Sequence, residues 1–269
     1  MLDSGQQAAD DFLAECDAIY AVVSPLTEAE LDAPTLFKNW SINDIIAHLH
    51  LWNMAADWTL HSPDKFQNLI SFTMGRLGEG MGHVAMQNAY FDGLKGRTLI
   101  AAWQDYYEPM AARFAVADPD ARVNWVGPDM SVKSCIIARQ MEHWAHAQAI
   151  FDVLGKVRIN TDRIKNVAHI GVTTYSWSFR VNGLDVPKPK PFVRLTAPSG
   201  AVWEWNEPQD DNALHGTATE FCQVVTQCRN IADTSLEMIG EAATAWMSFA
   251  QCFAGGAETP PAQGIRKKA

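Results

Sequence analysis

The sequence of 269 residues is short of cysteine and of basic side chains, and each shortage argues against a class of protein. Its five cysteines are odd in number and form no Cys-x-x-Cys pair, which fits neither a disulfide framework nor a cysteine zinc knuckle and is typical of a reduced compartment. Lysine and arginine together number 21 against 31 acidic residues, so the formal net charge is −10. Because a polyanion is normally bound by a basic face, this charge argues against nucleic acid as a partner.

Long apolar runs are also missing. No segment reaches the roughly 18 uninterrupted apolar residues that span a bilayer. The N-terminus, MLDSGQQAADDFL, is acidic and lacks the basic and apolar regions of a signal peptide. These absences predict a cytoplasmic protein that has no membrane partner. We expect its partner to be a small-molecule substrate, and a homodimer is left open.

The first half of the chain has the pattern of successive helices. Apolar side chains recur at three- and four-residue steps, and Ser41 is followed three residues later by Asp44, the spacing of a helix capping pair. Four glycines at 75–82 are expected to break the middle of this half. The long helices are predicted at 4–23, 41–61, 96–117 and 131–155, which favours an antiparallel four-helix bundle.

The second half has a different texture. Short β-branched and aromatic runs, separated by proline and glycine, predict strands at about 168–181, 191–196 and 201–205, and helical spacing returns at 217–253. We therefore expect a helical bundle domain over 1–157, a small α+β domain over 162–256 and a flexible tail over 257–269.

Two pairs of polar residues on the predicted bundle helices have the spacing of a site. Glu142 and His146 are four residues apart and share one helix face, on which Cys135 and Arg139 also fall. On another helix Asp44 and His48 are four apart, while His50 points largely away from His48.

Bundles build metal sites from inward side chains of facing helices. One histidine from 41–61 with Glu142 and His146 would give a two-histidine, one-carboxylate set, which suits zinc with an open position or ferrous iron. Spacing alone also allows a plain reading, in which Glu142 and His146 are a solvated pair and His48 is a core histidine. It likewise leaves Cys135 either lining a cavity or buried as an inert thiol.

Longer motifs add a family resemblance. The run from Trp40 to Leu49 resembles the W-x-x-x-D-x-x-x-H-L signature of the DinB-like superfamily. The run from Arg139 to Gln148 resembles the R-x-M-E-x-W-A-H-x-Q segment of its branch of metal-binding proteins related to mycothiol-dependent maleylpyruvate isomerase, and so does R-V-x-W-x-G-P-x-M-S at 122–131. Further stretches at 197–200, 221–227 and 250–255 extend the resemblance over nearly the whole chain.

This resemblance implies a fold and a set of ligands. It implies an N-terminal four-helix bundle with one divalent metal, usually zinc, held by His48, Glu142 and His146, and a smaller C-terminal domain that is loosely sterol-carrier-like. It also implies that Arg229 holds an anionic substrate. The family pattern T-Q-R-R-H is T-Q-C-R-N here, at 226–230, so no role is carried over to residues 228 and 230.

Three functions remain open at this point. The leading hypothesis is metal-dependent chemistry of a low-molecular-weight thiol, either S-transfer or thiol-assisted isomerisation of a small organic acid or activated carbonyl compound. The first alternative is a hydrolase, lyase or hydratase that uses metal-bound water, and the second is a non-catalytic ligand-binding protein with a structural metal. Zinc is the expected metal, with iron or nickel as alternatives.

Two neighbouring residues complete the predicted site. Asp44, one helical turn before His48, is expected to accept a hydrogen bond from that imidazole. Arg139, one turn before Glu142, is expected either to pair with a substrate carboxylate or to form a structural salt bridge.

Overall fold

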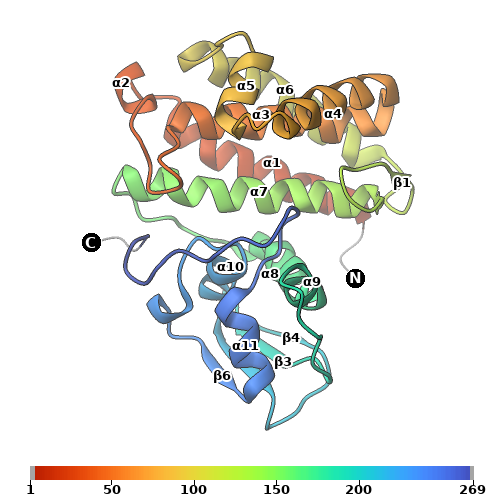
Figure 1. Ribbon diagram of the computed structural model, residues 1–269, viewed down its shortest axis with the longest axis vertical. Coiled ribbons are helices and arrows are strands. Elements are labelled where there is room, and N and C mark those ends of the chain that lie inside the picture. The colour runs from red at the N-terminus through yellow and green to blue at the C-terminus, as the bar shows by residue number, and fades with distance from the viewer. Residues whose placement is uncertain (1–3, 267–269) are drawn as a thin grey trace. The chain divides into compact units, whose positions relative to one another are not determined.

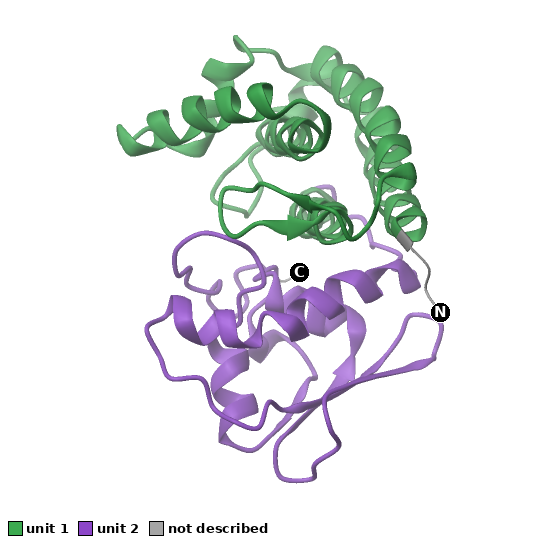
Figure 2. Ribbon diagram, turned by 90° about the vertical axis from the view of Figure 1, so that its right-hand side faces the viewer, with its two compact units in different colours: residues 1–153 green, residues 154–269 purple. Residues whose placement is uncertain are grey.

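The computed structural model describes residues 4–266, which fall into two compact units, Met1–Val153 and Leu154–Ala269 (Figure 2). The division comes just before the junction expected at 157–162. In the described part of the chain, no helix is both long enough and apolar enough to cross a membrane.

The first unit is helical, and its four long helices confirm the predicted ones to within two residues. Helices α1 and α3 each pack against both α6 and α7, so the four close around a common core (Figure 1). Shorter helices lie between them. The elements are α1 (Ser4–Val23), α2 (Glu28–Leu31), α3 (Ile42–His61), α4 (Pro63–Gly78), α5 (His83–Tyr90), α6 (Gly96–Val116) and α7 (Val132–Val153).

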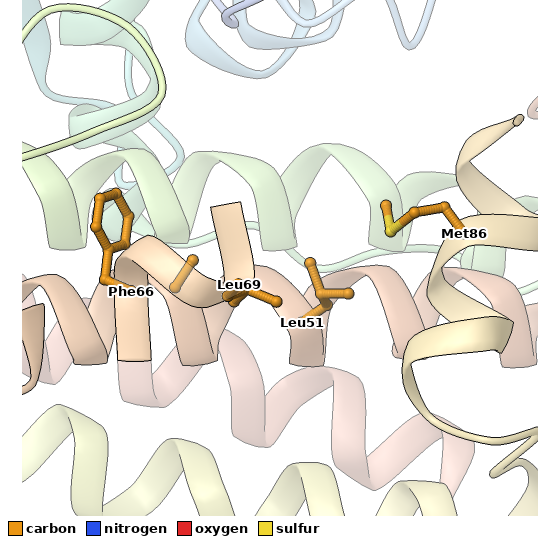
Figure 3. Close-up of a cluster of buried hydrophobic side chains, with 5 residues drawn as sticks. Leu51, Phe66, Leu69 and Met86 are labelled. Atoms are coloured by element: carbon orange, nitrogen blue, oxygen red, sulfur yellow. The ribbon is translucent and has the colours of Figure 1, made fainter. Parts of the chain in front are cut away.

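The glycine-rich stretch separates α4 from α5, as expected, and the break falls at 79–82. Both helices pack on α3 through a cluster of buried apolar side chains that includes Leu51, Phe66, Leu69 and Met86 (Figure 3). A short hairpin, β1 (Arg122–Val123) with β2 (Met130–Ser131), carries Trp125 onto this cluster. These contacts hold α5 against the outer side of α3.

The second unit combines helices with a four-stranded sheet of order β4-β3-β5-β6. Strands β3 and β5 run parallel, and the other two pairs are antiparallel. The strands expected at 191–196 and 201–205 are confirmed as β3 and β4. The elements are η1 (Asp162–Ile164), α8 (Lys165–Thr173), α9 (Tyr175–Val181), β3 (Phe192–Thr196), β4 (Val202–Trp205), β5 (Ala213–Thr217), α10 (Ala218–Val225), η2 (Ile231–Asp233), β6 (Glu237–Ile239) and α11 (Glu241–Phe249).

The strand expected at 168–181 is wrong, because this segment forms α8 and α9. Its buried side chains recur at helical steps, and Gly171 lets α8 approach α10 so closely that a Cβ there would lie 2.8 Å from Val225 and 2.9 Å from Phe221. Packing against α10 thus overrides the strand propensity of the β-branched and aromatic residues. The segment 217–253 is not helical throughout either, since β6 interrupts it, and β5 was not predicted.

The flexibility expected of the tail over 257–269 stays a prediction. The described part of this tail, 257–266, is tied to the turn that follows α10: Gln227 donates from Nε2 to the carbonyl of Glu258 at 3.0 Å, and Asn230 donates from Nδ2 to the carbonyl of Pro261 at 2.8 Å. Arg266 donates back from Nη1 to the carbonyl of Gln227 at 2.8 Å. These bonds hold the segment on the second unit. Residues 267–269 lie outside the described part.

Candidate metal centre

Three side chains that the sequence singled out come together inside the first unit. His48 comes from α3, and Glu142 and His146 come from successive turns of α7. One donor atom from each lies within 4.8 Å of the other two. Glu142 Oε2 is 3.4 Å from His146 Nε2 and 4.0 Å from His48 Nε2. The packing of α3 against α7 therefore brings two imidazole nitrogens toward one carboxylate.

The chemistry and exposure of this donor set fit a divalent metal. Two imidazoles and a carboxylate are a common ligand set for zinc and ferrous iron, and three protein donors leave a coordination position for another molecule. The imidazoles are each 11% exposed, whereas the Glu142 side chain is 23% exposed. Of the three side chains, that of Glu142 is thus the most accessible to solvent.

The surroundings favour the protonation states that bind metal. Burial lowers the pKa of His48 well below its ordinary value, and the nearby charges of His146 and Arg139 lower it further, so that the imidazole is neutral. For Glu142, burial acts to raise the pKa, but the hydrogen bond from His146 and the charges of His146 and Arg139 outweigh it. The pKa of Glu142 is lowered as a result, and the carboxylate is ionised.

Aromatic rings hold the imidazoles in place. Trp40 stacks on His146 with ring centroids 5.9 Å apart and planes 7° apart, and Phe37 meets the same imidazole edge-on at 5.0 Å. Trp40 also contacts the ring of His48 at 5.3 Å. The Nδ1 atoms of His48 and His146 are buried and find no hydrogen-bond partner among the described residues. Ring packing thus takes the place of the hydrogen bond that usually orients a metal-binding histidine.

A tight turn presents the two aromatic rings. Trp40 donates its backbone N–H to the carbonyl of Phe37 at 2.9 Å, and the residues between them, Lys38 and Asn39, have φ values of 50° and 58°. Two successive residues with positive φ are the mark of a type I′ turn, which normally favours Asn-Gly. Non-glycine residues in this conformation are strained, and such strain often accompanies a functional site.

The predicted role of Asp44 is corrected. Its Oδ2 accepts hydrogen bonds from the backbone N–H of Ser41 at 2.8 Å and from the Ser41 hydroxyl at 2.7 Å, while its own N–H donates to Ser41 Oγ. This is the capping box that begins α3. The carboxylate therefore serves the helix end, and in the described part of the chain no hydrogen bond joins it to His48.

Arg139 does not form the structural salt bridge that was one of its two expected roles, and its pairing with a substrate carboxylate stays a prediction. It is 3% exposed and donates from Nε to Asn53 Oδ1 at 3.2 Å and from Nη2 to the carbonyl of Leu49 at 3.4 Å. No carboxylate oxygen within residues 4–266 pairs with it at 4.0 Å or less, although the charge of Glu142 acts on it through space. Its side chain therefore fastens α7 to α3 from within the bundle.

The same buried network includes a histidine that faces away from the metal ligands. His143 is fully buried, and its Nδ1 lies 2.7 Å from the carbonyl of Arg139 and its Nε2 lies 3.3 Å from Asn53 Nδ2. The carbonyl can only accept, so Nδ1 carries the proton and Nε2 accepts from Asn53. Sequence reasoning missed Asn53, because an isolated asparagine on an apolar helix gives no spacing signal.

Three further residues considered in the sequence are Cys135, His50 and Arg229. Cys135 is 1% exposed, and burial raises the pKa of its thiol to about 12. Of the two roles left open for this residue, these properties fit the buried and unreactive thiol. His50 stacks on Phe91 at 5.1 Å, away from the cluster. Arg229 belongs to the second unit, where it is 8% exposed and donates from Nη1 to the carbonyl of Cys228 at 2.9 Å. Its binding of an anionic substrate stays a prediction.

The fold and the cluster define a class: a helical bundle that gathers two histidines and a glutamate between facing helices. The family model for the mycothiol maleylpyruvate isomerase N-terminal domain matches residues 12–151, which contain all three of these side chains. The chain belongs to this family.

The curated relatives span the whole chain. Two uncharacterized proteins of Mycobacterium tuberculosis, MT0041 of strain CDC 1551 / Oshkosh and Rv0036c of strain H37Rv, are each 31% identical to it over 98% of this chain and all of their own length. Among solved structures, mycothiol-dependent maleylpyruvate isomerase and a mutant of it align at 16% identity with a TM-score of 0.43, over 82% of this chain and 88% of theirs.

Proposed function

We propose that this protein is a metal-dependent enzyme whose nucleophile is a low-molecular-weight thiol, acting by S-transfer or by thiol-assisted isomerisation on a small organic acid or activated carbonyl compound. The observation that carries the proposal is the convergence of His48, Glu142 and His146 within a family that includes a thiol-dependent isomerase. His48 Nε2, His146 Nε2 and the Glu142 carboxylate are the proposed ligands, and zinc is the proposed metal.

A divalent metal in this position would act as a Lewis acid and lower the pKa of a bound thiol or water. The surrounding side chains determine how accessible each proposed ligand is. Glu142 is the most exposed of the three proposed ligands, and Trp40 and Phe37 pack on the imidazole of His146. In an isomerisation the thiolate sulfur would add to one alkene carbon while the π electrons of that double bond move onto the conjugated carbonyl group. After rotation about the resulting single bond the electrons return, the double bond re-forms and the thiolate leaves unchanged.

Arg229 is proposed to bind the carboxylate of the substrate. An arginine suits this task because its guanidinium presents two parallel N–H donors to one carboxylate. Its substitution by alanine is then expected to weaken the binding of an anionic substrate and to leave the metal content unchanged.

The first test is elemental analysis of the protein purified without chelators, beside His48→Ala. We expect about one equivalent of metal in the wild type and loss of it in the variant, with helical content retained by circular dichroism. His50→Ala is the matched control, because this histidine lies on the same helix and packs on Phe91 instead. Metal at background that neither zinc nor ferrous iron restores would refute the proposal.

Screening of the metal-loaded protein then separates the three hypotheses. Turnover that requires an added thiol supports the proposal. Turnover of a hydrolysable or hydratable compound without thiol would favour the metal-bound water alternative, and ligand binding without any turnover would favour the non-catalytic one.

A further inference from the structure

His83 is a third histidine near the metal centre. It is the exposed first residue of α5, directly after Gly82. The centroid of its ring lies 6.2 Å from that of His48 and 6.4 Å from that of Trp40. The helical spacing within 41–61 and 131–155 pointed to His48, Glu142 and His146, and His83 lies outside both of these segments. The packing of α5 against α3 brings it to the cluster.

The distances indicate that His83 is not itself a metal ligand. It does not belong to the group whose donor atoms lie within 4.8 Å of one another. Zinc–nitrogen bonds are about 2.0–2.1 Å long and zinc–sulfur bonds about 2.3 Å. His83 therefore stands outside bonding distance in this arrangement, but its ring lies beside that of the ligand His48, so a molecule bound to the metal on that side would meet it.

The other rings around the cluster make this position distinctive. Phe37 has no polar atom on its ring, and the indoles of Trp40 and Trp52 can only donate. A neutral imidazole both donates and accepts, and His83 is exposed, whereas the ligand imidazoles are each 11% exposed. A carboxylate on a molecule bound at the metal would lie near the negative Glu142, and a donor such as His83, beside the ligand His48, would offset that repulsion.

On the basis of the proposed function, we propose that His83 is a further substrate-contacting residue of the metal centre. A ring N–H of His83 donates a hydrogen bond to an anionic oxygen of the molecule held at the open coordination position. The ligand class is a small thiol or thiol adduct that carries a carboxylate close to its sulfur. The sulfur binds at the metal, and the carboxylate binds at His83.

The test uses the full-length protein loaded with Co²⁺ and two probe thiols. Mercaptoacetate carries both a thiol and a carboxylate, whereas ethanethiol carries the thiol alone. Binding of either is followed by the thiolate-to-cobalt absorption band. We expect His83→Ala to retain its cobalt and to bind mercaptoacetate about tenfold more weakly, in keeping with the loss of a charge-assisted hydrogen bond, while its affinity for ethanethiol is unchanged.

Two further variants make the result specific. His83→Gln keeps an N–H donor and is expected to recover part of the lost affinity for mercaptoacetate. Asn88→Ala, at another exposed position of α5, is expected to behave as the wild type with both thiols.

The outcomes separate this inference from the proposed function. Equal affinities of wild type and His83→Ala for mercaptoacetate, an equal loss for both thiols, or loss of cobalt from His83→Ala would each overturn the role of His83 and leave the thiol chemistry standing. If the wild type binds no cobalt, or neither thiol changes its spectrum, the proposed function fails and the role of His83 fails with it.

Discussion

The indole of Trp40 lies parallel to the imidazole of His146, with 7° between their planes and 5.9 Å between their centroids. Metal-binding histidines are usually oriented by a hydrogen bond from the second ring nitrogen. Here that nitrogen is buried and finds no such partner within residues 4–266, and a flat ring covers the imidazole. The orientation of this ligand therefore depends on the short turn before α3, which carries Trp40.

The first prediction concerns this stacking. Trp40→Leu should weaken zinc binding by about tenfold, since loss of a group that orients a ligand typically costs 10–100-fold in metal affinity. Competition with a chromophoric chelator measures the change. Trp58→Leu removes a tryptophan of the same unit that packs against the apolar cluster of Leu51 and Phe66, and it should leave zinc affinity unaltered. Equal losses in the two variants would point to a general loosening of the unit.

The second prediction concerns the strain in the turn. Asn39 has a φ of 58°, which glycine adopts at no steric cost, so Asn39→Gly should raise the free energy of unfolding by about 0.5–1 kcal/mol. Asn88→Gly, inside α5, should lower it by a similar amount, because glycine is unfavourable in a helix. Urea unfolding at pH 7 measures both changes. A destabilised Asn39→Gly would contradict the assignment of strain.

The third prediction separates the two roles considered for Asp44. As a capping residue, Asp44→Ala should cost about 1 kcal/mol of stability, with Ser41→Ala showing a similar loss. Zinc affinity should be the same in both variants as in the wild type. A fall in zinc affinity in Asp44→Ala alone would restore the role that the sequence spacing suggested.

The fourth prediction concerns a buried carboxylate that joins α3 to α6. Asp57 accepts two hydrogen bonds of 2.7 Å from Arg113 and one of 2.9 Å from Tyr106, and it also pairs with His61 at 3.0 Å. Its burial acts to raise the pKa, but the hydrogen bonds from Arg113, His61 and Tyr106 lower it overall. The ionised form is therefore the one that the fold stabilises.

The sign of the pH dependence follows from this lowered pKa. Asp57 contributes its full stability above its unfolded pKa of about 4, and the contribution is lost as the pH falls through the lower folded pKa. Asp57→Asn should be less stable than the wild type by about 1–3 kcal/mol at pH 7. The loss should not exceed this range, because the Arg113 side chain is 39% exposed and solvent weakens its ion pair with Asp57. The difference should shrink below pH 4 in urea unfolding. A difference that is constant with pH would show that the ionised carboxylate adds nothing.

Local patterns predicted the first unit well because its long helices have apolar residues at helical steps and begin and end at recognisable residues. Ser41 and Asp44 mark the start of α3, and Pro63 follows its end. Helical spacing placed Glu142 and His146 on one helix face, and the family resemblance implied His48 as the third ligand. Their meeting with His48 depends on which face α3 turns to α7, which a single sequence does not encode in its spacing.

The errors arose where packing between distant segments decides the structure. The segment 168–181 has the composition of a strand, yet Gly171 admits the side chains of Phe221 and Val225, and the segment is helical. Strand β5 gains its hydrogen bonds from β3, some twenty residues earlier, rather than from local sequence. His83 and Asn53 were missed for a similar reason, since each reaches its partners from a separate helix.

The three proposed ligands come from two helices, and this has a consequence for stability. A metal ion shared by α3 and α7 would act as a reversible cross-link between segments almost a hundred residues apart. A ligand that binds only the folded state stabilises it by RT ln(1 + [L]/Kd), so the melting temperature should rise with free zinc and fall on adding chelator. Thermal melting would then measure the fraction of the protein that has metal bound, even before a substrate is identified.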